Sequence, residues 1–550
     1  MVNLHRSSRI AGVLALVLAT CASAADSPDL EVVHRIKREA FARSKVMNHL
    51  FHLTDVHGPR LTNSPGYDAA AQWVVDKAIE WELDNAAVEE WGPYGRGWST
   101  SYFSAHMVEP TYATLIGVPL AWAPGTEGVV DGIPILAYAP ASMFSRSSEI
   151  EASRADLKEY ISRWHGKLQG AIVMLQAPRH LDTLESAPSR RLTSSDLADR
   201  ATAPEPTEPI EIDLDNPVPP EDPYDRRRYE AQLSREARLA RRQLRNEIRY
   251  SLNSFLQDEG VRLVVRPASR GDGGNIFPPR AGRHSEDAVD PPPSIALAQE
   301  HYNRLARLLS AGIEPRVQVE VRARFHTATL NATNVVAEIP GRGKSDELVI
   351  IGAHLDDVAY ATGATDNAAG CAVMMEVMRI LKTLDLAMDR TVRMVLWSGE
   401  EEGLLGSKAY VTEHFGEPDK GTATADHAKV SAYYNLDNGT GKIRGIYLQG
   451  NDMVRPIFTS WLAPFRDLGA TTLSIRNTGG TDHLSFDRVG IPGFQFIQDP
   501  VEYNSRTHHS TMDVYDRVQA GDLMQASAII ASFVYETANR AERLPRKPLQ

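Results

Sequence analysis

One apolar run constrains the fold of this chain more than any other segment. Residues Leu348 to Ile351 are continuous and largely β-branched, which is typical of a strand buried on both faces of a parallel sheet. The apolar spacing over residues 368–384 predicts a helix packed on that sheet. Together they predict an α/β fold with a mixed, mainly parallel sheet flanked by helices.

Metal-ligating side chains recur just after such apolar runs. His354 ends the first strand, and Asp366 stands at the entrance of the predicted helix. Glu401 and Asp437 follow two further apolar runs, and His509 is expected to arrive from a late loop. In open α/β sheets ligands bind outside the carboxyl ends of the strands, so these side chains are expected to converge.

The convergence offers the ligands of a two-metal site. Such a site needs a bridging carboxylate, further nitrogen and oxygen ligands on each ion, and a base beside the shared water. We expect Asp366 to bridge the ions. His354 and Asp437 would complete one ligand set, and Glu401 and His509 the other.

Three neighbouring residues are predicted to support the ligands. Glu400 is adjacent to a ligand and is the candidate general base. A ligating imidazole usually donates its second ring nitrogen to a carboxylate or a carbonyl. Asp356, two residues after the first histidine, and Asp513, four after the last, are placed to accept those hydrogen bonds.

Each of these residues also has an ordinary structural interpretation. His354 is compatible with a hydrogen-bonded core histidine, and Asp366 with a helix N-cap. Residues 400–402 are compatible with an acidic turn, and Asp437 with the start of a turn. His483 is either a substrate-pocket donor or a structural hydrogen bonder. The joint order of the motifs favours one metal site over several separate structural roles.

Several segments carry a family resemblance. They read GAHLDD, TDNAAG, SGEEEGLLGS, NLDNGTG, GGTDHLSF with GIPGF, and HHSTMD, in this order. Jointly they resemble the successive motifs of the M28 family of di-zinc peptidases. The resemblance implies a zinc exopeptidase fold, two Zn²⁺ ions per chain, Glu400 as the base and Glu401 as a ligand. The family's last ligand lies four residues before an Asp, which implies His509 rather than His508.

The N-terminal segment HGPRLTNSPGYDAAAQWVVDKAIEW and the His508-His509 pair resemble the carboxypeptidase Q-like branch of that family. Members of that branch act on small peptides and dipeptides. Many family members place a Tyr before the last ligand, where it helps to stabilise an oxyanion. This chain has His508 there, so His508 and His483 become the candidate donors.

The domain organisation is predicted from local patterns. Residues 30–105 are expected to be mainly helical, whereas residues 110–320 contain short β-like runs such as 171–175 and 261–265. The resemblance implies that the second segment is an inserted β-rich, protease-associated-like domain. In chain order, we predict a signal peptide (1–24), an N-terminal part of the peptidase domain (25–109), the insert (110–320), the metal-binding core (321–540) and a tail (541–550).

A charged segment at about residues 185–255 departs from the family pattern. Residues 203–223 are rich in Pro and acidic residues and are expected to be extended and solvated. The Arg-dense residues 226–249 predict one exposed helix. A membrane or acidic-partner role is the alternative to a solvated helix.

The first residues predict export. Arg6 and Arg9 precede an apolar core at residues 10–20, and Ala22-Ser23-Ala24 is a small-residue cleavage site. Cys21 faintly resembles a lipoprotein site, but the Thr before it disfavours anchoring. We therefore expect a secreted or periplasmic protein. Cleavage after residue 24 leaves Cys371 alone, without an intramolecular disulfide.

Charge and length narrow the function further. The net charge of −12, from 59 basic and 71 acidic residues, argues against a nucleic-acid partner. The apolar N-terminal core is too short for a stable membrane span. The chain is interpreted as an exported zinc exopeptidase for small peptides, an aminopeptidase or a dipeptidase, with Glu400 as base. A noncatalytic peptidase-like binding ectodomain, a single-zinc acyl-transfer cyclase, other divalent ions and a homodimer remain open.

Overall fold

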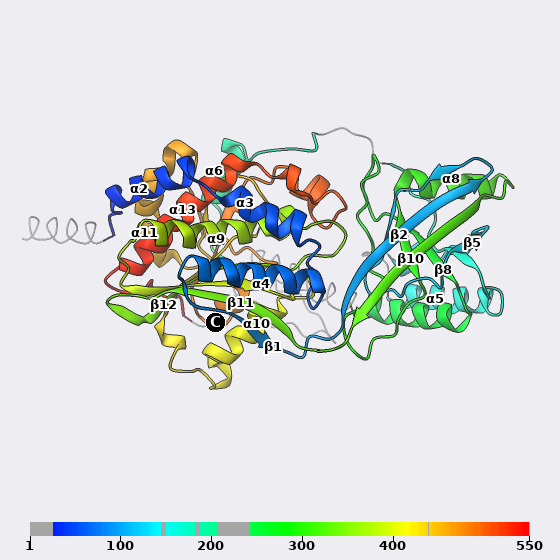
Figure 1. The fold of residues 1–550 in the computed structure, drawn as a ribbon, viewed down its shortest axis with the longest axis horizontal. Helices are drawn as coiled ribbons and strands as arrows, with labels where there is room; N and C mark the ends of the chain where they lie inside the picture. The colour runs from blue at the N-terminus through cyan, green and yellow to red at the C-terminus, as the bar shows by residue number, and fades with distance from the viewer. Residues whose placement is uncertain (1–25, 145–149, 182–186, 207–242, 438, 549–550) are drawn as a thin grey trace, which may run out of the picture.

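The computed structural model describes residues 26–144, 150–181, 187–206, 243–437 and 439–548. The expected signal peptide and Cys21 lie outside these residues, as do residues 207–242 of the charged segment. Two units lie side by side, one built on a large sheet covered by helices and one built on two smaller sheets (Figure 1).

The large sheet has eight strands in the order β1-β11-β13-β12-β14-β17-β15-β16. Its neighbouring strands β13, β12, β14 and β17 run parallel, whereas β1, β11 and β15 introduce antiparallel pairs. The predicted mixed, mainly parallel sheet flanked by helices is confirmed. The strands are β1 (Asp84–Trp91), β11 (Ala332–Ile339), β12 (Lys344–His354), β13 (Arg390–Trp397), β14 (Val430–Asn435), β15 (Ile443–Tyr447), β16 (Thr472–Ser474) and β17 (Gly493–Gln498).

Helices cover both faces of this sheet. The helices of the unit are α2 (Leu30–Ala42), α3 (Val46–Phe51), α4 (Pro65–Glu80), α9 (Ala369–Thr383), α10 (Leu405–Phe415), α11 (Arg455–Leu462), α12 (His483–Asp487) and α13 (Ala520–Asn539). Ile351 of β12 packs in one core cluster with α9 and α13, whereas its neighbour Ile350 packs with α10 and α12. Because successive strand residues point to opposite faces, a strand covered on both sides needs a continuous apolar run.

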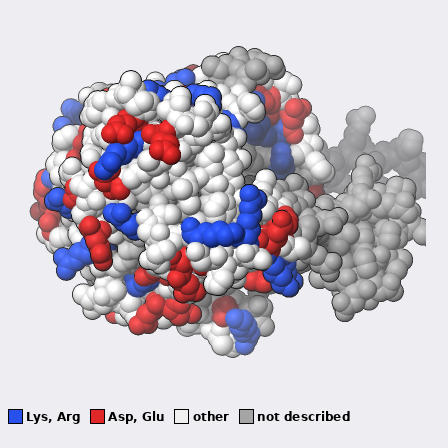
Figure 2. All heavy atoms as spheres, turned by 90° about the vertical axis from the view of Figure 1, so that its right-hand side faces the viewer, with Lys and Arg blue, Asp and Glu red and all other residues white. Residues whose placement is uncertain are grey.

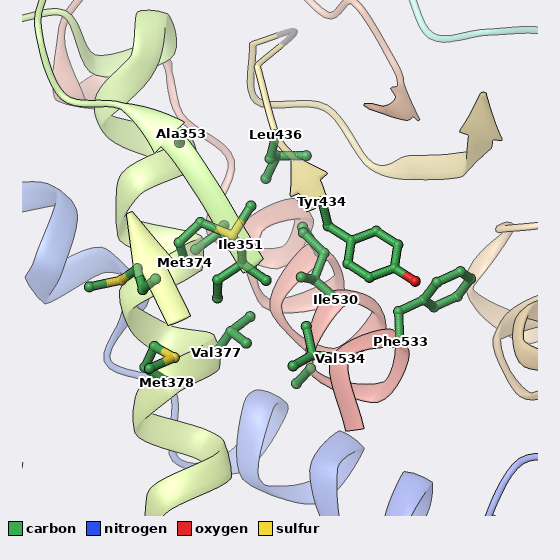
Figure 3. Packing of buried hydrophobic residues seen from close by; sticks show 14 of the residues in the cluster. Ile351, Ala353, Met374, Val377, Met378, Tyr434, Leu436, Ile530, Phe533 and Val534 are labelled. Atoms are coloured by element: carbon green, nitrogen blue, oxygen red, sulfur yellow. The ribbon is translucent and has the colours of Figure 1, made fainter. Parts of the chain in front are cut away.

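The core between β12, α9 and α13 is densely apolar. Figure 3 shows Met374 and Val377 of α9 beside Ile351, and Phe533 of α13 beside Tyr434 of β14. Phe533 is fully buried, and its ring also lies 5.3 Å from that of Phe458. This packing holds the sheet and its carboxyl edge in place.

The expectation that residues 30–105 are mainly helical is wrong beyond α4. Residues 84–91 form β1, an edge strand that pairs antiparallel with β11, and Gly97–Glu109 forms β2 of the other unit. Most side chains of β1 are exposed or half-buried, so an alternating apolar signal is weak there. Pairing with a distant strand decides the conformation instead.

The second unit contains a four-stranded sheet, β3-β2-β10-β5, and a five-stranded sheet, β4-β9-β8-β7-β6. Its elements are β2 (Gly97–Glu109), β3 (Ala113–Thr114), β4 (Gly117–Pro119), β5 (Val130–Gly132), β6 (Ile135–Leu136), α5 (Ile150–Trp164), β7 (Ile172–Met174), β8 (Leu263–Pro267), β9 (Ser294–Leu297), α8 (Gln299–Ser310) and β10 (Arg316–His326). The helix α6 (Ser194–Ala201) lies between β7 and β8 in sequence but packs on the large unit, where Leu197 is buried with Ile497 of β17 (Figure 1). The long β2–β10 ladder runs from the large unit into this one (Figure 1).

The Arg-dense helix is only partly within the described residues. Residues 243–258 are helical, and Leu244 and Ile248 are buried in a cluster with Tyr160 of α5. For this part, the expectation of an exposed helix is wrong, because its apolar stripe packs on α5 and β7 of the second unit rather than facing water.

Two further observations concern the whole described chain. Cys371 is buried and makes no disulfide. None of the helices in the described ranges combines the length and the apolar character needed to cross a bilayer.

Replacing Phe533 with Ala is expected to lower the free energy of unfolding of the large unit by about 3–5 kcal/mol, because it leaves a cavity between α13 and the sheet. Chemical denaturation followed by tryptophan fluorescence measures the change. The matched control is Phe41→Ala, which removes a 39% exposed ring and is expected to change stability by at most about 0.5 kcal/mol. Equal effects of the two substitutions would contradict the packing argument.

Candidate metal centre

Three parallel neighbours place the candidate ligands at one edge of the sheet. His354 is the last residue of β12 and lies in register with Trp397, the last residue of β13. Glu401 follows β13 after a short loop, and Asp437 follows β14. The carboxyl ends of β13, β12 and β14 therefore deliver all three side chains to the same place.

Two ligand candidates come from outside the strands. Asp366 lies in a π-helical turn, Ala364–Ala368, immediately before α9. His509 follows a second such turn, Tyr503–Thr507, and has a positive φ of 61°.

Asp366 joins the two halves of the site. Its Oδ1 lies 3.1 Å from Nε2 of His354, and its Oδ2 lies 3.2 Å from Nε2 of His509. His354 Nε2 is also 3.5 Å from Asp437 Oδ1, and His509 Nε2 is 2.9 Å from Glu401 Oε2. The structure thus brings all five predicted ligands together, with one carboxylate common to both groups.

The carboxylates around His354 and His509 favour the binding of cations. Burial alone lowers the pKa of His354, but Asp437, Glu400 and other carboxylates outweigh it and raise that pKa well above the ordinary value. At His509, burial also lowers the pKa, but the carboxylates of Glu401 and Asp366 outweigh burial and raise it to about 11. Without metal, both imidazoles therefore keep a second proton. A divalent ion would replace that proton, because only a neutral imidazole ligates a metal.

The donor set fits zinc. Asp366 Oδ2 and Glu401 Oε1 are buried oxygens without a hydrogen-bond partner among the described residues. Imidazole nitrogen and carboxylate oxygen are both ordinary zinc ligands. Two compact donor groups, His354 with Asp366 and Asp437, and Asp366 with His508 and His509, have ligand atoms within 4.8 Å of one another.

The first histidine is oriented by the chain next to it. His354 Nδ1 lies 3.0 Å from the backbone carbonyl of Asp356 and 3.5 Å from its Oδ1. Donation to that carbonyl leaves Nε2 facing Asp366. The Asp356 carboxylate accepts from Thr62 Oγ1 at 3.1 Å, and Thr62 Oγ1 accepts from Gly399 N at 2.8 Å. The loop of Glu400 is thereby tied to the end of β12.

Asp513 has a different partner from the one expected. It accepts from the backbone N–H groups of Thr365 at 2.6 Å and Asp366 at 3.1 Å, and no hydrogen bond joins it to His509 among the described residues. The reason is the turn before α9, whose backbone N–H groups lack intrahelical acceptors. Asp513 thus positions the shared carboxylate rather than the last histidine.

Glu400 is half-buried beside the ligands. Burial raises its pKa well above the ordinary value, and the negative charges of Asp437 and Asp482 add to that increase, while His354 opposes it. A carboxylate with a raised pKa can both take up and release a proton near neutral pH.

The two candidate oxyanion donors differ in position. His483 is fully buried, its Nε2 lies 3.1 Å from the carbonyl of Thr478, and burial lowers its pKa to about 4. His508 is half-exposed, with Nε2 3.6 Å from Asp366 Oδ2 and its ring 3.9 Å from that of His509. Only His508 lies against the metal ligands.

Some residues of the centre carried no assigned role in the sequence. Tyr503 stacks on His508 with ring centroids 4.6 Å apart. Arg60 is fully buried and donates to the carbonyls of Leu355 at 2.8 Å and Thr362 at 2.7 Å, which braces the loop between two ligands. Arg60 lies in the segment HGPR, which carries part of the family resemblance, so the sequence could have pointed to it. No spacing or motif in the sequence pointed to Tyr503.

A pocket opens onto the shared carboxylate. It is lined by Asp357, Val358, Ala361, Gly363, Asp366, His509, Ser510 and Asp513. From the second unit, Arg280 Nη2 donates to the backbone carbonyl of Glu401 at 2.8 Å. The centre thus lies where the two units meet.

Solved structures with this fold include metallopeptidases. The Peptidase M28 precursor from Shewanella amazonensis SB2B has a TM-score of 0.62 at 21% identity, over 94% of this chain and 98% of that chain. BSAP, a zinc aminopeptidase from Bacillus subtilis, has a TM-score of 0.51 at 16% identity, over 91% of this chain and 97% of that chain. At these identities the likeness concerns the fold.

Relatives are also found by sequence. Carboxypeptidase Q of Mus musculus is 30% identical over 275 residues, 50% of this chain and 56% of that protein. Aminopeptidase YwaD of Bacillus subtilis (strain 168) is 30% identical over 210 residues, 37% of this chain and 44% of that protein. The chain therefore spans about half the length of the curated relatives it matches.

The family match coincides with the metal centre. Residues 334–534 match the family described as Peptidase family M28, and this range contains all five ligand candidates. The chain therefore carries a domain of peptidase family M28.

Proposed function

We propose that this protein is a zinc-dependent exopeptidase that hydrolyses the peptide bonds of small peptides. The observation that carries the proposal is the position of Asp366, whose two oxygens each face one histidine of the cluster. The match to Peptidase family M28 and the similarity to a carboxypeptidase and an aminopeptidase support it.

The residues would hold two ions around one carboxylate. Asp366 would be common to both ligand sets, His354 and Asp437 would complete one, and Glu401 and His509 would complete the other. When bound, zinc would supply Lewis acidity for the scissile carbonyl and would lower the pKa of the attacking water.

The protein's own groups then move the proton. Glu400 accepts the proton of the attacking water at a carboxylate oxygen and delivers it to the nitrogen of the leaving amine. Burial of Glu400 favours the protonated intermediate state, since burial disfavours the charged carboxylate.

His508 is the candidate donor to the carbonyl oxygen of the substrate. Its ring is half-exposed beside Asp366 and is held by stacking on Tyr503. His483 is buried and turned toward Thr478, so we assign it a structural role. Asp356 and Asp513 position the ligands through His354 and the backbone of Asp366.

Export belongs to the same proposal. The basic start, the short apolar core and the small-residue site in residues 1–24 support cleavage and release into the periplasm or the medium. Small peptides in that compartment would be the substrates.

The two alternatives lack support from the site. A noncatalytic binding ectodomain would need neither five converging ligand candidates nor a half-buried carboxylate, Glu400, beside them. A single-zinc cyclase would not need the second group around His509 and Glu401. Counting metal ions per chain and assaying a dipeptide series separates the three functions.

Replacing Glu400 with Gln is expected to lower kcat by about 10²- to 10⁴-fold, because the variant lacks the base. Zinc content is expected to stay at the wild-type value, since Glu400 is not a ligand. Steady-state kinetics on a dipeptide and mass spectrometry of bound metal measure both. Glu413→Gln, an exposed Glu on α10, is the control and is expected to retain full activity. Full activity of the Glu400 variant would remove the base from the mechanism.

Replacing His509 with Ala is expected to lower the bound metal from two ions per chain toward one, because one ligand set loses its imidazole. His508→Ala is expected to keep both ions and to lose turnover. Elemental analysis of the purified variants measures the ions per chain. Depletion in the His508 variant, with an intact metal content in the His509 variant, would show that the two histidines have the opposite roles.

A further inference from the structure

Residues 187–206, which we call the arm, cross from the second unit to the large one. In sequence the arm lies between β7 and β8, inside the charged segment that departs from the family pattern. Its helix α6 packs beside β16, and its Leu192 and Leu197 are buried with Ile497 of β17 (Figure 1). The arm is therefore a built part of the large unit, although it is encoded within the second.

The arm reaches the part of the large unit that carries the candidate histidines. Residues 499–511, which we call the histidine loop, follow β17 and contain His508 and His509. The end of the histidine loop is held by the second unit, where Thr511 N donates to Ile276 O at 2.9 Å. Its beginning is held by the arm.

Hydrogen bonds join the arm to the beginning of the histidine loop. Arg190 N donates to Val501 O at 3.0 Å, and Leu192 N donates to Asp499 Oδ1 at 2.9 Å. Ser505 Oγ donates to a backbone carbonyl of the arm. The main chain of the loop is thus bound on a segment that comes from a distant part of the sequence.

An arginine fastens the arm at the same point. Arg191 Nη1 lies 3.2 Å from Asp499 Oδ2, and its Nη2 lies 2.7 Å from Asp522 Oδ2 in the first turn of α13. Asp499 also pairs with Arg444 of β15 at 3.0 Å, whereas Asp522 has no second ion pair among the described residues. Both carboxylates are buried, and an uncompensated buried charge is strongly destabilising. Arg191 is therefore required where it lies.

This position differs from the outward surface of the second unit. Figure 2 shows basic and acidic side chains close together around a broad uncharged area on that face. Exposed ion pairs of the unit, as between Arg316 and Asp131, contribute little because water screens them. The partners of Arg191 have no such access to water.

Two residues of the histidine loop have strained backbone conformations. Val501 has a φ of 45° and His509 a φ of 61°, in the left-handed region that is unfavourable for residues with a Cβ atom. Val501 is β-branched, which makes this conformation rarer still. Such conformations persist only where surrounding contacts impose them. The carbonyl of Val501 is the one that the arm binds, so the arm supplies part of that constraint.

We propose that the arm is a clasp that holds the histidine loop ready for the second metal ion, with Arg191 as its positioning residue. This inference rests on the metal centre of the proposed function. The ligand set concerned is that of His509 and Glu401, whose side chains lie 2.9 Å apart. His354 and Asp437 belong to strand ends and do not lie on the loop. A loop that is set before the ion arrives raises the fraction of molecules competent to bind, and the affinity increases by the same factor.

Arg191→Ala tests the clasp in the full-length protein. One zinc ion is expected to bind about ten- to a hundredfold more weakly, and the other to stay within about twofold of wild type. Arg191→Lys, which keeps a cation, is expected to restore part of the affinity. The matched control is Arg190→Ala, whose 60% exposed side chain pairs with Asp196 of the arm itself, and wild-type binding is expected. Competition with a chromophoric chelator measures both affinities.

Two further measurements separate positioning from a general loss of structure. In metal-free Arg191→Ala protein, amides of the histidine loop are expected to exchange hydrogen faster than in wild type, and those of α9 at the same rate. At saturating zinc, kcat on a dipeptide is expected to return to the wild-type value by mass action. Ser505→Ala removes a hydrogen bond to the arm and leaves no buried charge. It is expected to weaken the same zinc ion by a smaller factor, and it decides the question if Arg191→Ala does not fold.

Several results would overturn the clasp. They are unchanged zinc affinity and loop exchange in the Arg191 and Ser505 variants, equal weakening of both ions, a kcat that zinc does not restore, or the same zinc loss in Arg190→Ala. The zinc titration and the exchange use no substrate, so they decide the clasp whether or not dipeptides are cleaved. Absence of hydrolysis by the zinc-loaded wild-type protein would instead overturn the proposed function.

Discussion

The structure depends on holding several buried carboxylates close together. Asp366, Glu401 and Asp437 meet at the carboxyl edge of the sheet. At Glu401, burial and the negative charge of Asp366 raise the pKa, while His509 opposes that increase. Two unit charges 4 Å apart interact by about 4 kcal/mol near a protein surface, so the repulsion must be balanced. The imidazoles offset part of this repulsion, and bound divalent cations would offset the rest.

A rigid scaffold holds these charged side chains close together despite their repulsion. The apolar core between β12, α9 and α13 fixes the strand ends, and a buried polar network fixes the loops above them. Arg60 binds carbonyls on both sides of the loop after β12, and Thr62 links that loop to the segment of Glu400. Because these partners are buried, the ligand positions are determined before any ion binds.

The second unit takes part in the metal centre rather than only covering it. The loop that carries His508 and His509 is held by that unit, since Thr511 N donates to Ile276 O at 2.9 Å and Asn275 Nδ2 donates to Arg506 O at 2.9 Å. Residues 187–206 return to the large unit, where Arg191 pairs with Asp499 at 3.2 Å and with Asp522 at 2.7 Å. The positions of the candidate ligand His509 and of Arg280 therefore depend on how the two units meet. Residues far away in sequence thus hold the loops that carry the candidate ligands.

The sequence by itself determined the sheet, the helix after β12 and the ligand candidates, because those signals are local. A continuous apolar run requires a strand covered on both faces, and the residue after such a run must lie at the edge where His354, Glu401 and Asp437 are found. Only the tertiary structure decided that residues 84–91 form an edge strand, that Leu244 and Ile248 are buried, and that Asp513 holds the backbone of Asp366. It alone brought Tyr503 and Arg280 to the centre. The physical reason is that strand pairing and polar partners are chosen across hundreds of residues, where periodicity and spacing along the chain carry no information.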